Sequence, residues 1–95
     1  MKAVLWFPSA QQDLKLISDY IAQENANAAY ATLRIIKATV GNLSIFPNIG
    51  KVGRISGTRE IVTKGAPYII LYQITDKNIR ILAVKHAAQK WPEST

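Results

Sequence analysis

The chain has no cysteine among its 95 residues and a single histidine, His86. Without cysteine, disulfide bonds and thiolate metal sites are impossible. One histidine excludes a site built from several imidazoles, and carboxylate ligands are scarce because the chain has only six Asp and Glu residues. We therefore expect no metal and no cofactor.

Long apolar runs are also missing. The longest, "YIILYQI" (68–74), is far shorter than the ~20 residues that cross a bilayer. The opening "MKAVLWF" (1–7) is shorter than the apolar core of a signal peptide. We expect one domain over residues 1–95, located in the cytoplasm and without a membrane partner.

Common catalytic signatures are absent as well. Glycines that cradle a phosphate stand between a strand and a helix, whereas Gly50, Gly53 and Gly57 precede a predicted strand. A hydrolase triad would have to use His86, but the sequence has no nucleophile-elbow motif.

Acidic residues are outnumbered, which gives a net charge of +6. The excess lies in the second half of the chain: residues 1–50 hold four basic and three acidic side chains, and residues 51–95 hold eight and three. This distribution favours a polyanionic partner, either nucleic acid or an acidic protein. Solubility is the alternative explanation.

The first half of the chain predicts a strand and two helices. Residues 2–7 form the strand, and Ser9 with Gln12 gives a capping-box pattern for a helix that continues to about residue 23. An asparagine in "ENANA" (24–28) can cap a second helix, which should end near residues 46–47. The short connection makes the two helices antiparallel neighbours.

The second half predicts strands. After a glycine-rich loop at residues 47–57, strands are expected at 58–64, 68–74 and 78–84, joined by turns so short that they must form an antiparallel meander. The predicted fold class is therefore α+β. Its element order is β-α-α-β-β-β, with a helical hairpin packed on a small antiparallel sheet.

The middle strand is apolar on both sides, since Tyr68, Ile70, Tyr72 and Ile74 alternate with Ile69 and Leu71. Two helices can cover one face only, and the pattern does not say which. The second face should be covered by loops, by the C-terminal tail or by another molecule. This predicts a binding surface.

Three segments, in this order, resemble the RelE/ParE family of bacterial toxins, and its ParE-like subset most closely. They are "WFPSAQQDLKLISDYIAQENANAA" (6–29), "GTREIVT" (57–63) with "YIILYQI" (68–74), and "ILAVKHAAQKWP" (81–92). The resemblance spans residues 5–92 and implies the toxin of a type II toxin–antitoxin system, which inhibits growth, stabilises plasmids and is silenced by a small antitoxin. Such antitoxins have a flexible, often acidic segment that wraps the toxin.

The family divides by target: ParE-like members poison DNA gyrase, and RelE-like members cleave messenger RNA on the ribosome. In the cleaving branch an arginine typically follows the first tyrosine of the central strand, where this chain has Ile69. A second arginine commonly lies just beyond the last strand, where Ala87 and Ala88 stand. We therefore expect a gyrase inhibitor without an active site of its own, with a ribosome-dependent endoribonuclease as the alternative.

Candidate site residues come from the basic half and from the aromatic side chains around it. Arg59 and His86 are the weak catalytic candidates, as phosphate-contacting and proton-transferring groups. Each also has a structural alternative: Arg59 can pair with an acid, and His86 can bond backbone at a strand end. The residues expected to bind the antitoxin or the target are Arg54, Arg59, Tyr72, Arg80, Lys85, His86, Lys90 and Trp91. For Tyr72 the alternative is core packing, and for Trp91 it is anchoring the tail.

Overall fold

The computed structural model describes residues 1–89, whose elements follow the predicted order with two additions. They are β1 (Ala3–Trp6), α1 (Pro8–Ala22), α2 (Ala26–Leu43), a 3-10 helix η1 (Pro47–Ile49), β2 (Lys51–Val52), β3 (Arg59–Val62), β4 (Tyr68–Ile74) and β5 (Asn78–His86). The additions, η1 and β2, have three and two residues and are too short to produce a periodic pattern. None of the helices in this part of the chain could span a membrane.

The sheet has five strands in the order β1-β5-β4-β3-β2. The predicted meander of β3, β4 and β5 is confirmed as antiparallel, but β1 pairs with β5 in parallel. The expected antiparallel sheet is therefore mixed. The helical hairpin separates β1 from the other strands in the sequence, so that β1 can take the edge position next to β5. The composition of a strand does not predict whether it pairs in parallel or antiparallel.

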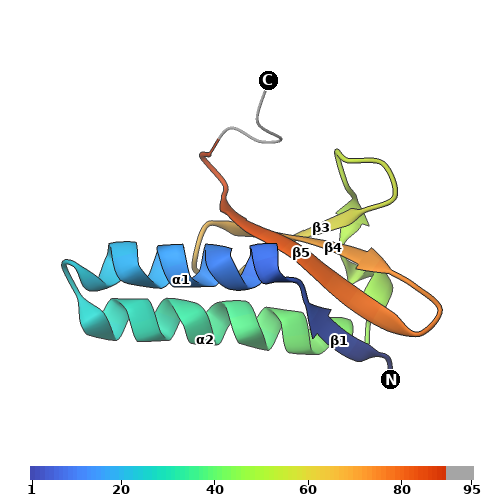
Figure 1. The fold of residues 1–95 in the computed structure, drawn as a ribbon, viewed down its shortest axis with the longest axis horizontal. Helices are drawn as coiled ribbons and strands as arrows, with labels where there is room; N and C mark the ends of the chain where they lie inside the picture. Colours follow the sequence, from blue (N-terminus) through green and yellow to red (C-terminus); the bar gives the residue numbers. More distant parts are fainter. Residues whose placement is uncertain (90–95) are drawn as a thin grey trace.

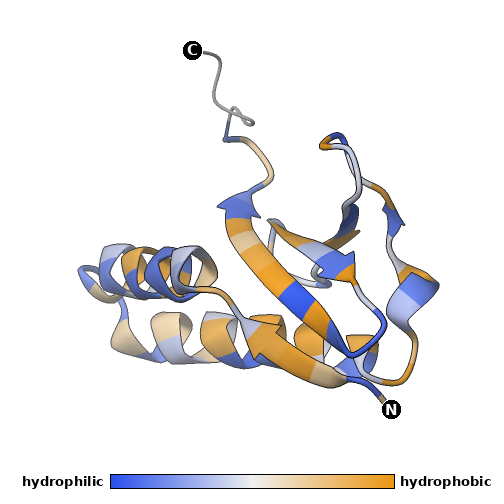
Figure 2. Ribbon diagram, turned by 45° about the vertical axis from the view of Figure 1, so that its right-hand side comes forward, coloured by the Kyte–Doolittle hydropathy of each residue, from blue (hydrophilic) through white to orange (hydrophobic). Residues whose placement is uncertain are grey.

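Both helices cover one face of the sheet, and the segment between β2 and β3 projects on the other side (Figure 1). The covered face carries the alternate residues Tyr68, Ile70 and Tyr72 of β4, which pack against α2. The remaining buried members of this core are Ala10, Ile36, Val40, Leu43, Ala66, Ile79, Ile81 and Val84. Hydropathy along β5 is high over most of its length and falls at the arrowhead near the C-terminus (Figure 2).

The opposite face is less open than predicted. Ile69 and Leu71 point away from the main core but are only 7% and 6% exposed, because they form a second cluster with Leu82 and Ala83. Leu82 is the extra residue of a bulge, since Leu71 pairs with Ala83 and the next residue of β4 pairs with Ile81. At these positions the face is therefore covered by the protein's own side chains, and the predicted binding surface is wrong there.

The sequence predicts a side-chain cap for each helix, and the structure confirms only the cap of α2. Helix α1 begins at Pro8, and no side chain caps it, so the predicted capping box does not form. The hydroxyl of Ser9 instead donates to the carbonyl of Leu82 at 2.6 Å, because β5 passes close enough to compete for it. Asn25 does cap α2, since its side chain accepts from the Ala28 N–H at 3.0 Å.

Candidate functional site

Helix α1 neutralises one of the predicted binding cations at the end of β5. One carboxylate oxygen of Asp13 accepts from the Val84 N–H at 2.9 Å, and the other lies 3.3 Å from the Lys85 ammonium. The carboxylate therefore satisfies the open edge of β5 and pairs with its lysine at the same time. Lys85 is held by the protein's own helix and is not a free cation at the rim of the sheet.

His86 has a mainly structural set of contacts. Its Nδ1 accepts from the Ala88 N–H at 3.0 Å, and its ring meets Tyr68 edge-on with the centroids 5.4 Å apart. The neutral ring consequently carries its proton on Nε2. His86 also lines an open groove of about 640 Å³ together with Leu16 and Tyr20 of α1. These contacts match the structural alternative for a histidine at a strand end.

Arg59 and Tyr72 are paired across β3 and β4 and bind the same loop. The Tyr72 hydroxyl accepts from the Gly50 N–H at 3.0 Å and donates to the Pro47 carbonyl at 2.6 Å. Arg59 Nη1 donates to the Gly50 carbonyl at 2.5 Å. Burial raises the pKa of Tyr72, partly opposed by the Gly50 hydrogen bond and the Arg59 charge. The phenol therefore stays neutral and holds the loop in place.

Gly50 is required at this point because of space. A Cβ there would lie 2.6 Å from the Tyr72 hydroxyl and 2.7 Å from the Glu60 carbonyl oxygen. Tyr72 itself is 0% exposed. The predicted contact of Tyr72 with a partner does not fit this burial, and its role is the alternative one, inside the core.

Arg54 and Glu60 form a charged pair whose carboxylate is buried. The Arg54 guanidinium reaches both carboxylate oxygens of Glu60, at 3.1 and 3.2 Å, and its backbone N–H donates at 2.8 Å. Glu60 is 2% exposed. Burial alone would raise the pKa of this carboxyl, but the Arg54 hydrogen bonds and charge, with Lys51, outweigh burial and lower the pKa.

The predicted site residues thus do not form one cationic rim. Arg80 lies near the start of β5, with its guanidinium 6.0 Å from the centre of the Phe7 ring and 3.5 Å from the side-chain amide oxygen of Gln73. Arg54 and Arg59 serve the loop before β3, whereas Lys85 and His86 lie at the end of β5. Lys90 and Trp91 lie outside the described residues. In the described range no three acidic or histidine side chains are grouped to hold a metal.

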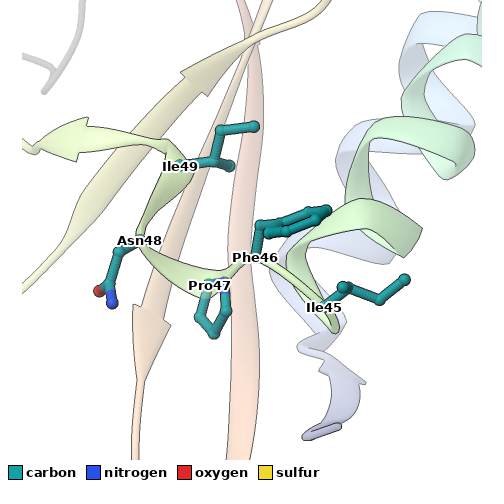
Figure 3. A pocket seen from close by; sticks show the side chains of 5 residues that line it. All are labelled: Ile45, Phe46, Pro47, Asn48 and Ile49. Carbon is teal, nitrogen blue, oxygen red and sulfur yellow. The ribbon is translucent and has the colours of Figure 1, made fainter.

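The structure has an apolar surface around η1 that the sequence analysis did not predict. Ile45, Phe46 and Ile49 are each more than half exposed and border a hollow of about 450 Å³. Their side chains point to the same side, toward α2, while Asn48 points the other way (Figure 3). The sequence signal for this surface is the apolar pair 45–46 directly before a proline, a pattern that also predicts the end of a helix.

A comparison with protein families supplies the decisive observation. Residues 4–91 match the model described as ParE toxin of type II toxin-antitoxin system, parDE. The chain belongs to the ParE toxin family. It is a toxin of a type II toxin–antitoxin system, within the ParE/RelE superfamily.

Named relatives of this ParE-family chain span almost its whole length. It is 38% identical to a protein named toxin Y4kP of Sinorhizobium fredii over 92 residues, which cover 97% of this chain and 95% of that one. It is 33% identical to toxin RelE2 of Caulobacter vibrioides over 89 residues, covering 94% and 99%.

Solved structures share the fold. A chain of the chromosomal ParDE system of P. aeruginosa matches with a TM-score of 0.81 at 22% identity, covering 90% of this chain and 96% of that chain. A chain of the RelBE2 toxin–antitoxin complex of Mycobacterium tuberculosis matches with a TM-score of 0.57 at 26% identity, with the same coverage. The β-α-α-β-β-β order is therefore the fold of ParE- and RelE-type toxins.

Proposed function

We propose that this ParE-family toxin, when free of its antitoxin, inhibits DNA gyrase in the cytoplasm as a protein inhibitor that traps the cleaved-DNA state of gyrase. The toxin has no active site of its own in this proposal. An antitoxin with a flexible acidic segment holds it inactive, which accords with its net charge of +6.

The separation of the two catalytic candidates carries the proposal. Arg59 pairs with Tyr72 and His86 pairs with Tyr68, so their partners on β4 are four residues apart. At ~3.4 Å per residue this amounts to ~14 Å along the strand. Cleavage of RNA needs charge stabilisation and proton transfer at one phosphate, which groups so far apart do not provide together.

The position of Ile69 supports the same proposal. In the messenger-RNA-cleaving branch of the family, an arginine typically stands at this point, whereas Ile69 is 7% exposed in an apolar cluster. The turn after β5 offers Ala87 and Ala88 in place of a second cation. An apolar side chain at the central position cannot neutralise a phosphate.

The test uses purified toxin, gyrase, ATP and relaxed plasmid. We expect reduced supercoiling and accumulation of cleaved DNA without breaks in messenger RNA, because this mechanism requires no proton transfer by the toxin. The opposite outcome would be intact gyrase activity together with codon-positioned breaks in ribosome-bound transcripts, detected by primer extension and abolished by His86→Ala. That result would establish the endoribonuclease instead.

A further inference from the structure

The loop between β2 and β3 projects on the side of the sheet opposite the helices (Figure 1). Its two ends are joined, because the Gly53 N–H donates to the Thr58 carbonyl at 2.8 Å. Within it, the Ile55 carbonyl accepts from the Thr58 N–H at 3.2 Å and from the Thr58 hydroxyl at 2.6 Å. The segment is therefore closed by its own hydrogen bonds, and we name residues 53–58 the β2–β3 loop.

One glycine fixes the turn at the end of the β2–β3 loop. Gly57 has a φ of 79°, and it is the third residue of the turn that the Thr58–Ile55 hydrogen bond closes. A positive φ at this position is what a type II turn requires, and a residue with a Cβ rarely adopts it. The sequence therefore favours one conformation of the turn.

A buried carboxylate holds the β2–β3 loop against the sheet. Glu60 of β3 accepts from the backbone N–H of Arg54 at 2.8 Å and from its guanidinium at 3.1 and 3.2 Å. Both the backbone and the side chain of Arg54 are thus fixed relative to β3. Together with the hydrogen bonds inside the loop, this pair preforms the loop before any partner arrives.

The preformed segment exposes apolar side chains. Val52 of β2 is 78% exposed and Ile55 of the loop is 37% exposed. The projecting loop includes a hydrophobic segment at its end (Figure 2). Lys51 and Arg54 bring two positive charges to this surface against the one buried negative charge of Glu60. The surface is therefore apolar with a small positive excess.

We propose that the β2–β3 loop, together with Val52, contacts the gyrase protein at an apolar site bordered by acidic side chains. The inference rests on the proposed function, because the partner is gyrase. An inhibitor without an active site acts through a binding surface, and a preformed surface loses little conformational entropy on binding. Binding to the DNA backbone calls for several cations and not for exposed Val52 and Ile55, so this surface fits a protein better than DNA.

A charge placed in the proposed contact tests it in the gyrase assay. Because Val52→Asp puts a carboxylate into the apolar contact, we expect the toxin concentration for half-maximal DNA cleavage to rise about tenfold or more. Leu16→Asp is the matched control, since Leu16 lies on α1 and is also an exposed apolar side chain, at 57%. It should leave that concentration nearly unchanged. Equal shifts in both variants, or no shift with Val52→Asp, would overturn the proposal.

Gly57→Ala tests whether the shape of the loop is recognised. A Cβ there has room, with the Gln73 side chain nearest at 3.8 Å, but it disfavours the positive φ. Gly65→Ala is the control, because Gly65 has a φ of 77° and nothing within 4 Å of its Cβ position. Both variants should lose similar stability, and only Gly57→Ala should weaken gyrase inhibition. Full potency of Gly57→Ala would refute the preformed contact.

Two binding measurements identify the partner of the loop. Val52→Asp should bind gyrase in the absence of DNA about tenfold more weakly than the unmodified toxin does. It should bind the protein encoded by the small reading frame adjoining the toxin gene with unchanged Kd, which also shows that the variant is folded. A loss of affinity for that small protein, or for plasmid DNA alone, with unchanged affinity for gyrase would overturn the proposal.

The outcomes separate this inference from the proposed function. If the unmodified toxin inhibits gyrase and Val52→Asp inhibits it equally, the contact surface is wrong and the proposed function stands. If the unmodified toxin leaves gyrase untouched, the proposed function is wrong and the contact with gyrase is refuted with it.

Discussion

The hydroxyl of Tyr72 makes the sharpest prediction about stability. It accepts from the Gly50 N–H and donates to the Pro47 carbonyl, and it does so in a fully buried position. Tyr72→Phe removes the oxygen and leaves both backbone groups unpaired. Leaving buried polar groups unpaired costs ~1–3 kcal/mol, so we expect the free energy of unfolding to fall by about 2 kcal/mol.

For a domain of this size, that loss corresponds to a fall in Tm of roughly 8–16 °C. The measurement is urea unfolding followed by circular dichroism, together with a thermal scan. Tyr68→Phe is the matched control, because Tyr68 lies on the same strand and face but its hydroxyl bonds to no residue of the described range. The control should change stability by less than about 0.5 kcal/mol.

The result that would refute this reasoning is an equal loss in both variants. It would mean that the hydroxyl contributes through solvation or packing and that the loop before β2 is not held by the Tyr72 hydrogen bonds. A larger loss at Tyr72 with unchanged m-value would localise the effect to the native state.

Two further predictions concern ion pairs. Because Glu60 has a lowered pKa in the folded protein, the stabilisation from its pair with Arg54 is fully present above the ordinary value of 4.5 and is lost as the pH falls through the lower folded pKa. Glu60→Gln should therefore flatten the acid limb of a stability–pH curve, and an unchanged limb would contradict the pairing. Asp13→Ala should cost ~1–2 kcal/mol because the Val84 N–H loses its acceptor, measured by urea unfolding. Asp19→Ala, which breaks an exposed pair, should have no measurable effect, and a similar loss in both would contradict this role.

Much of the fold was predictable from the sequence because its signals are local. Apolar spacing and an asparagine cap within residues 24–28 located the start of α2, and short turns required β3, β4 and β5 to pair as hairpins. The start of α1 was misjudged because the hydroxyl of Ser9 prefers a carbonyl on β5, a contact between residues 73 positions apart. Local patterns contain no information about such a competitor.

The candidate site was predicted less well, because the type of a residue does not reveal which other residues it contacts in the folded protein. Lys85 was expected as a free cation, but Asp13 of α1 neutralises it. For Tyr72 the sequence leaves partner binding and core packing open, and its burial and the hydrogen bond of its hydroxyl to Pro47 favour core packing.

The sequence by itself determined the element order, the pairing of the last three strands and the positive charge of the second half, because neighbouring residues and short turns dictate each of these. Only the tertiary structure decided which face the helices cover and the parallel position of β1. These features depend on contacts between distant segments, whose geometry is set when the core packs and not by the residues that flank each position.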